Sequence, residues 1–484
     1  MDRRVFLGSL TGGPLLATGI TDASPSGRQQ QGTFGTPFPE GGESGGDHPP
    51  IPNFCAHEHW GSIASIGMAP EGFRADAEAG ALPTRRTTLL DLLIDPYLGG
   101  WMAAAGFNAA DIARKFGKAD LQSAWIDSPD QVFNEIRPHL ERQRLTGVFQ
   151  CLRRGITLLH GHDIGSLDLE AWKAADQSIA MRYESLFQWY RKAMEQAGFS
   201  ELIRPVHPSF FIRSQSDSSA QEELSFTHTI LRIDPLLGLW TTDSQKRDKM
   251  AETFGVEPVD AASWRKLILA IFDAAAQKGT TGIKQLQAYS RSLDFQEADE
   301  SQVAWVGDLT PYQVTTFKNW VVNECCRQAH ERGWPHQIHV GTHNLSKSSP
   351  LPLEFLAKRY PRMKLVLIHC WPFIDESGWL AKYLPNVYLD TCWQTVLNPD
   401  FFRRALKAWL GYVPHHKIMC SHDSTSLEMA AGSSLFTREI LAEELGEHAG
   451  VLQIPHKDMS QLAAGFLHNN AVDVYGIGTV FQVD

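Results

Sequence analysis

The chain lacks several features that would point to a particular class of partner. Its 484 residues contain 44 Lys and Arg against 55 Asp and Glu, which gives a net charge of −11. Nucleic acids and anionic membranes attract clustered basic residues, so this acidic chain gives no reason to expect either partner. No uninterrupted run of about 20 strongly apolar residues occurs, so we expect no membrane span.

Cysteine is scarce and carries no recognisable spacing. The seven cysteines include no CxxC pair, and their number is odd. This pattern favours neither a zinc ribbon nor a disulfide framework. Cys55, Cys370, Cys392 and Cys420 lie in or beside short apolar runs. We expect these four to be small buried core residues.

Two further absences narrow the fold. No GxGxxG motif follows the first predicted strand, which argues against a doubly wound dinucleotide-binding sheet. We find no internal repeat that would mark a solenoid or a propeller. Hydrophobic residues at 43% and charged residues at 20% lie in the usual range for a globular protein with a sizeable core.

The first 50 residues differ from the rest in composition. Arg3 and Arg4 precede a mildly apolar stretch over residues 7–20 and small residues around Ala23. This resembles a twin-arginine export signal, so we predict a signal peptide over residues 1–23 and a periplasmic location. Residues 24–50, rich in Gly, Ser, Pro and Gln, are predicted to be a flexible linker. The folded part is then 51–484.

Short apolar runs alternate with longer amphipathic stretches beyond residue 50. The eight strand candidates are 51–57, 156–160, 202–211, 282–288, 337–341, 365–369, 387–390 and 417–420. The helix candidates are 87–98, 130–144, 169–197, 264–278, 311–332, 352–360 and 399–410. This alternation predicts an α/β fold, a (β/α)₈ TIM barrel. We expect helical insertions, between the first two strands and over 214–262, to cap the carboxyl-terminal face.

The residues that could bind a metal or take part in catalysis lie at the ends of the predicted strands. His57 and His59 end the first strand, and since alternate side chains of a strand share one side, both can bind one metal ion. His339, His369 and Asp423 each follow a later apolar run. Barrel enzymes place their catalytic groups at such ends, and buried polar groups need partners.

This ordered set resembles the amidohydrolase superfamily. It is similar to the amidohydrolase-related, metal-dependent TIM-barrel branch, which includes decarboxylases and a barrel domain fused to some glutamine-synthetase-like proteins. The family's order is HxH after strand one, Lys or Glu after strand four, His after strands five and six, and Asp after strand eight. This chain supplies, in that order, His57, His59, Lys284, His339, His369 and Asp423.

The resemblance implies a metal held by His57, His59, His339 and Asp423. Imidazoles and a carboxylate suit a divalent ion such as Zn²⁺, with one position left for water. The ion brings the pKa of that water from about 15.7 to near 7. We expect Asp423 to act as general base and His369 to polarise the scissile carbonyl, or to bind a second metal.

The reaction expected from this site is hydrolysis of a C–N or C–O bond, as in an amide or a lactone, of a small polar substrate. A decarboxylase or a uronate-isomerase-like enzyme would use the same ligands. A non-catalytic exported binding protein is the third alternative. The sequence leaves a homo-oligomer open.

Lys284 has three alternative roles: carboxylated and bridging two ions, unmodified and contacting substrate, or paired with an acidic neighbour. We favour one ion. The residues expected to bind substrate are His343, Tyr289, Arg291 and Trp371. Other polar or aromatic residues expected near the same face are His160, His162, His207, Thr342, Trp60 and Trp393.

Overall fold

A computed structural model describes residues 50–59, 88–95, 97–239 and 245–483. The predicted signal peptide, Trp60 and all but the last residue of the predicted linker lie outside these ranges. No helix in the described ranges is long and apolar enough to cross a membrane.

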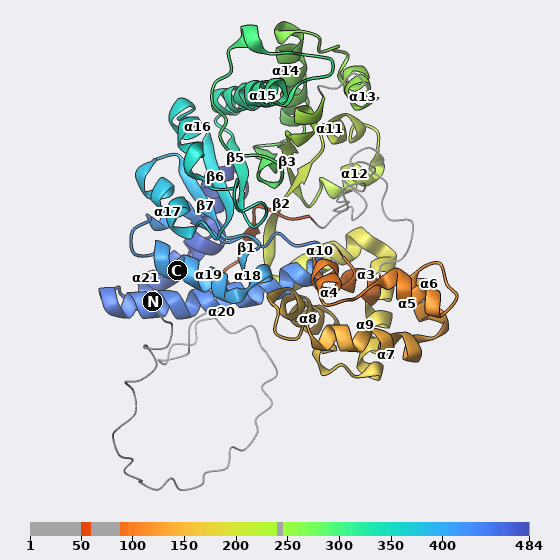
Figure 1. The fold of residues 1–484 in the computed structure, drawn as a ribbon. Coiled ribbons are helices and arrows are strands. Elements are labelled where there is room, and N and C mark those ends of the chain that lie inside the picture. Colours follow the sequence, from red (N-terminus) through yellow and green to blue (C-terminus); the bar gives the residue numbers. More distant parts are fainter. Residues whose placement is uncertain (1–49, 60–87, 96, 240–244, 484) are drawn as a thin grey trace, which may run out of the picture. The chain divides into compact units, whose positions relative to one another are not determined.

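Eight parallel strands form one sheet in sequential order from β1 to β8 (Figure 1). Their bounds are β1 Asn53–Cys55, β2 Phe199–Val206, β3 His228–Arg232, β4 Ile283–Gln285, β5 Pro335–Gly341, β6 Lys364–Trp371, β7 Val387–Asp390 and β8 Ile418–Met419. Two backbone hydrogen bonds join the segments that follow β8 and β1: Asp423 N donates to His57 O at 3.0 Å, and His59 N donates to Ser424 O at 3.1 Å. The predicted TIM-barrel fold is therefore confirmed.

The long connection between β1 and β2 is helical. It holds α3 Leu89–Leu93, α4 Leu98–Ala104, α5 Ala109–Lys115, α6 Leu121–Asp127, α7 Pro129–Glu141, α8 Gly147–His160, α9 Leu169–Arg182 and α10 Leu186–Ala197. The predicted helical insertion after the first strand is thus present. The helix predicted over residues 87–98 is broken into α3 and α4.

The remaining helices alternate with strands or end the chain. They are α11 Ser209–Arg213, α12 Ser218–Glu223, α13 Gln245–Phe254, α14 Ala261–Gln277, α15 Pro311–Arg332, α16 Glu354–Arg359, α17 Ile374–Tyr383, α18 Gln394–Leu397, α19 Pro399–Trp409, α20 Leu427–Leu452, α21 His456–Ala464 and α22 Asn470–Tyr475. Helix α15 matches its prediction at both ends. Thr310 and Gln313 form a capping box, and Gly333 ends the helix in the left-handed conformation.

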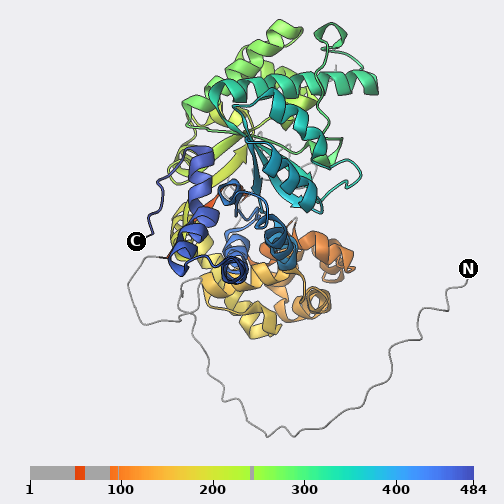
Figure 2. The same cartoon turned by 90° about the vertical axis from the view of Figure 1, so that its left-hand side faces the viewer.

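Helix α8 packs closely against α20, the helix that follows β8. A Cβ atom on Gly155 would lie 1.6 Å from Glu428 O, and one on Gly432 would lie 1.8 Å from Cys151 O. Both positions therefore require glycine, and the two backbones are in contact. Figures 1 and 2 show α20 beside the insertion helices. The insertion is fixed to the helix that begins just after Asp423.

Two strand predictions are wrong. Residues 156–160 are the last turn and a half of α8, where Leu152, Ile156 and Leu159 are buried at helical spacing. A short apolar run cannot distinguish a buried strand from a buried helix. The true third strand is β3, inside the segment 214–262 that we predicted to be an insertion. The run predicted over 202–211 is β2, the second strand.

The seven cysteines are buried and free, in agreement with the prediction for Cys55, Cys370, Cys392 and Cys420. The core of the insertion and that of the outer barrel layer each bury large aromatic side chains, among them Trp172 and Trp264. This packing holds the strand ends, where the polar residues gather.

Candidate metal centre

The six residues predicted to carry the chemistry lie in five strands or in the segments directly after them. His57 and His59 follow β1, Lys284 lies in β4, His339 in β5, His369 in β6, and Asp423 follows β8. All six are at most 8% exposed. Residues up to 366 positions apart in sequence thus share one buried region.

The Asp423 carboxylate lies at the centre of three imidazoles. Its Oδ1 is 3.4 Å from His59 Nε2, and its Oδ2 is 3.7 Å from His57 Nε2 and 3.4 Å from His369 Nε2. The Tyr97 hydroxyl, from the insertion, donates to Oδ1 at 2.7 Å. Each carboxylate oxygen therefore faces a different part of the imidazole cluster.

Hydrogen bonds to the outer ring nitrogens fix the tautomers of two histidines. His57 Nδ1 lies 2.7 Å from Gln337 Oε1, and the Gln337 amide is itself oriented by donating from Nε2 to Ala56 O and the Tyr475 hydroxyl, both at 2.7 Å. His369 Nδ1 donates to Cys392 O at 2.9 Å. Both rings therefore carry the proton on Nδ1 and turn the Nε2 lone pair toward Asp423, as metal-binding histidines do.

The electrostatics keep these imidazoles neutral. Burial lowers the pKa of His57 and of His369 well below the usual value, and the nearby Lys284 ammonium lowers both further. Neutral imidazoles and a carboxylate fit a divalent cation such as Zn²⁺. The compact groups of candidate ligands in the described residues are His57, His59 and Asp423, and His369, Cys392 and Asp423.

His339 lies beside these groups and belongs to neither. Its Nε2 is 2.7 Å from the Thr342 hydroxyl, which donates to Gly341 O, so Nε2 carries the proton. The buried Nδ1 has no hydrogen-bond partner, and the ring centroid is 4.3 Å from that of His369. Three of the four predicted ligands, His57, His59 and Asp423, therefore lie together. The unpartnered Nδ1 of the fourth, His339, lies beside them.

Lys284 is completely buried, and its ammonium nitrogen lies 2.9 Å from His57 Nε2. Burial lowers the pKa of Lys284 to about 8, although the Asp423 charge opposes the shift. Burial raises the pKa of Asp423 to about 6, and Lys284 and the Tyr97 hydroxyl oppose that shift. Of the three roles predicted for this lysine, simple pairing with an acidic neighbour is not seen, because the hydrogen-bond partner of its ammonium is the His57 imidazole.

A cavity of about 530 Å³ opens next to this cluster. Tyr97 and Trp101 from the insertion line it, together with Tyr289, His343 and Trp393 from the barrel. Their rings form a continuous stack: Tyr289 to His343 at 4.2 Å, His343 to Trp393 at 5.5 Å and Tyr97 to Trp393 at 5.0 Å between centroids. The structure thus brings the predicted Tyr289 and His343 to the cavity.

Two predicted substrate-binding residues are not among those that line this cavity. Arg291 donates to Ser292 O, Asp294 O and the Asn319 side chain, and its guanidinium lies over the Phe295 ring. Trp371 stacks on Phe401 with 3.6 Å between ring centroids. Local packing holds both side chains, and their predicted contact with substrate stays a prediction.

The other histidines predicted at this face do not line the cavity either. His160 lies at the end of α8 and contacts Glu428, with 2.9 Å between His160 Nε2 and a carboxylate oxygen. His207 bonds the Ser209 hydroxyl through Nδ1 at 2.8 Å. Neither these nor His162 line the cavity, whereas Thr342 and Trp393 do.

Sequence reasoning missed Tyr97, Trp101 and Gln337. Gln337 had a usable signal, since it stands two residues before His339 in β5 and so points to the same side of the strand. Tyr97 and Trp101 had none, because their position depends on how the insertion folds back over the barrel.

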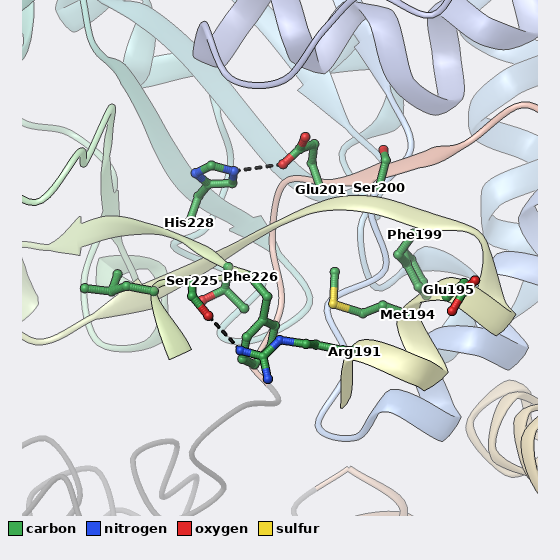
Figure 3. A pocket seen from close by; sticks show the side chains of 11 residues that line it. Arg191, Met194, Glu195, Phe199, Ser200, Glu201, Ser225, Phe226 and His228 are labelled. Atoms are coloured by element: carbon green, nitrogen blue, oxygen red, sulfur yellow. Dashed lines mark hydrogen bonds and ion pairs between the residues drawn. The ribbon is translucent and has the colours of Figure 1, made fainter. Parts of the chain in front are cut away.

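A second cavity, of about 430 Å³, lies where β2 and β3 begin (Figure 3). His228 Nε2 faces Glu201 Oε2 at 2.8 Å, and Arg191 donates to the Ser225 hydroxyl at 2.7 Å and to Glu222 at 3.1 Å. Met194 and Phe199 supply apolar surface. Its histidine and its arginine each face a carboxylate, so this cavity does not resemble the metal centre.

The fold and the site together define a barrel protein with a buried His and Asp cluster at the carboxyl ends of its strands. Residues 302–477 match the family model described as amidohydrolase, and the predicted resemblance to the amidohydrolase superfamily is confirmed. The divalent metal that this resemblance implies agrees with the ligand groups described above.

Individual relatives are distant. Protein fluG of Emericella nidulans is 27% identical over 286 residues, which cover 53% of this chain and 32% of that protein. The chain therefore spans about a third of the length of this curated relative. Two solved structures share the fold: a glucuronate isomerase from Caulobacter crescentus (16% identity, TM-score 0.64, 88% of this chain and 91% of that chain) and a uronate isomerase from Bacillus halodurans C-125 (15%, 0.63, 88% and 94%).

Proposed function

We propose that this protein is a metal-dependent hydrolase that cleaves a C–N or C–O bond, such as an amide or a lactone, in a small polar substrate. The observation that carries the proposal is the arrangement of His57 and His369, whose outer nitrogens are hydrogen-bonded and whose Nε2 lone pairs converge on Asp423. Such an arrangement costs solvation, and the buried His369 Nε2 has no hydrogen-bond partner within the described residues, which supports a role in binding a cation.

The proposed ligands are His57, His59 and Asp423, with His339 and His369 as neighbours able to join them. A divalent ion, in our proposal Zn²⁺, supplies Lewis acidity that polarises a carbonyl and acidifies water. We propose a single ion. A second ion would need Lys284 to be carboxylated, and burial, which lowers the pKa of this amine to about 8, makes the neutral form that such a reaction requires easier to reach.

Asp423 is the proposed general base. It takes a proton from the attacking water and passes it to the leaving group, while the Tyr97 hydroxyl holds Oδ1 in place. Burial raises the pKa of this carboxyl to about 6, nearer the working pH, which suits proton transfer in both directions.

His369 is better suited to bind a metal than to donate a proton to a developing oxyanion. Its single proton is held by Cys392 O, and burial disfavours a second one. Lys284 is a further donor next to the cluster. We propose that its ammonium, when protonated, stabilises the negative charge on the substrate oxygen.

The alternative is a decarboxylase or a uronate-isomerase-like enzyme that uses the same ligands. Three solved neighbours that carry the isomerase name each cover 88% of this chain, but at 14–16% identity they share the fold alone. The alternative stays open because the residues around Asp423 would serve either chemistry.

The decisive experiment combines metal analysis with product detection. The purified chain is expected to hold about one divalent ion, and a panel of lactones and amides is expected to yield carboxylic acid in proportion to metal content. Carbon dioxide release, or aldose–ketose interchange of a uronate with no hydrolysis, would replace hydrolase by the alternative. A chain that binds no ion and gains no activity from added metals would refute both.

Export by the twin-arginine route also remains a prediction. Recovery of the processed chain from the periplasm, and its loss when Arg3 and Arg4 are both changed to Lys, would support it.

A further inference from the structure

The turn that carries Asp423 is held by residues of β1 and the segment directly after it. Asp423 has φ +52°, in the left-handed region that side chains other than glycine rarely adopt. The three consecutive amides around it all donate to this one segment. His422 N reaches Cys55 Sγ at 3.2 Å, Asp423 N reaches His57 O at 3.0 Å, and Ser424 N reaches a Glu58 carboxylate oxygen at 2.8 Å.

Two of the three acceptors are side chains, and they are coupled. The Cys55 thiol donates to Glu58 Oε1 at 3.0 Å, while Glu58 Oε2 accepts the Ser424 amide. Both side chains are completely buried. Glu58 stands between His57 and His59 and, by strand alternation, points to the other side from them. The HxH motif thus contributes two ligands on one side and an anchor for a third on the other.

Side-chain acceptors are needed here because the backbone hydrogen bonds of the sheet end before residue 422. Strand β8 has only two residues, Ile418–Met419, and pairs with β7. The amides of 422 and 424 lie beyond it, so a side chain must accept their hydrogen bonds. An apolar residue at position 58 would avoid the cost of burying a carboxylate but would leave the Ser424 amide unsatisfied.

We infer that Glu58 and Cys55 are positioning residues that set the distance between the Asp423 carboxylate and the two ligand histidines, and so set the metal affinity of the centre. The inference rests on the proposed function only in taking Asp423 as a metal ligand. It assigns Glu58 an indirect role in metal binding, because its side chain holds the turn that carries Asp423 and does not contact the metal.

The test measures the dissociation constants of Zn²⁺ and Co²⁺ from the full-length chain and the visible absorption of the Co²⁺ form. Glu58→Gln replaces one acceptor oxygen by an NH₂ group, which cannot accept from an amide or a thiol. We expect it to weaken both metals about ten- to hundredfold and to alter the Co²⁺ spectrum. Cys55→Ala is expected to act in the same direction, and Cys55→Ser, which keeps a donor and an acceptor, to restore most of the affinity.

Glu428→Gln is the matched control. Glu428 is equally buried, but its carboxylate is held by His160 and the Tyr183 hydroxyl. We expect this variant to lose thermal stability while its metal affinity stays within about twofold of the wild type and its Co²⁺ spectrum is unchanged. The inference is overturned if Glu58→Gln binds metal like the wild type, or if Glu428→Gln loses as much affinity.

The proposed function can fail separately. A chain that binds metal with these differences but hydrolyses nothing would retain the positioning role and lose the hydrolase. If the wild type bound no metal, the proposed function and the metal-affinity part of the inference would both fail. Hydrogen exchange of the segment around Ser424 would then still decide whether Glu58 holds the turn, since protection should fall in Glu58→Gln and not in Glu428→Gln.

Discussion

The two ends of the barrel use similar side chains in different ways. Where β2 and β3 begin, His228 pairs with Glu201 and Arg191 pairs with Glu222, so each charge faces an opposite charge. At the other end, His57 and His369 hydrogen-bond with their outer nitrogens and turn their inner lone pairs toward one carboxylate. The paired groups are satisfied within the fold, whereas the buried His369 Nε2 and His339 Nδ1 have no hydrogen-bond partner among the described residues and are available to a bound ion.

The change expected to have the largest effect removes the shared carboxylate. Asp423→Asn keeps the shape and the Tyr97 hydrogen bond but loses the charge and the base. We expect hydrolysis to fall about 10²–10⁴-fold and bound metal to decrease, measured as steady-state rate and metal content at equal protein concentration. If activity and metal content equalled those of the wild type, Asp423 would have no part in the mechanism. The proposed difference between the two ends of the barrel would then be contradicted.

The next prediction concerns the hydrogen bond that fixes the His57 tautomer. Gln337→Leu leaves His57 Nδ1 without its acceptor, so the ring is free to place its proton on Nε2, where it would block a cation. We expect the metal dissociation constant to rise about ten- to hundredfold, measured by competition with a chelating indicator. Gln328→Leu, at a buried glutamine of α15, serves as control and should leave metal affinity unchanged. An equal loss in both variants would contradict this account.

A third prediction extends the comparison to the insertion that covers the metal centre. Asp95 accepts the Tyr97 and Leu98 amides and the Thr425 hydroxyl, and burial raises its pKa to about 6. The folded state therefore binds a proton that the unfolded state releases near pH 4, so the contribution of Asp95 to stability falls as the pH rises from about 4 to about 6.

Asp95→Asn should remove that component. The stability of the variant relative to the wild type should increase across this window by on the order of 2 kcal/mol, measured by denaturant unfolding at a series of pH values. A difference that is independent of pH would show that the Asp95 carboxyl has the same pKa in both states.

The smallest effect is expected at the opposite end. Glu201→Gln breaks a partly exposed ion pair with His228, which is worth about 0–1 kcal/mol. We expect a slight loss of stability and no change in metal affinity or rate. A clear loss of metal affinity would mean that the two ends are coupled and that the cavity between β2 and β3 is more than structural.

How much the sequence could predict depends on how local each signal is. Helix α15 and strand β7 match their predicted bounds because capping residues and a clean apolar run determine them. Strand β3 and the end of α8 were misassigned, because five-residue runs are decided by tertiary contacts. The alternation rule correctly brought His57 and His59 to the site. It could also have found Gln337, whereas Tyr97, Arg291 and Trp371 take positions set by packing of loops and helices far away in sequence.

The hydrogen bonds between Asp423 and His57, and between His59 and Ser424, join the last strand segment to the first. The ligands of the proposed ion come from both sides of this seam, so the complete set exists only in a closed ring. An intermediate that has formed seven strands would hold the two histidines without the carboxylate. Metal uptake during refolding should therefore report closure of the barrel. A bound ion would stabilise the closed barrel and slow the separation of the first and last strand segments. A permuted chain with new ends opened between Met419 and Asp423 would then fold its helices and most of its strands and still fail to retain metal.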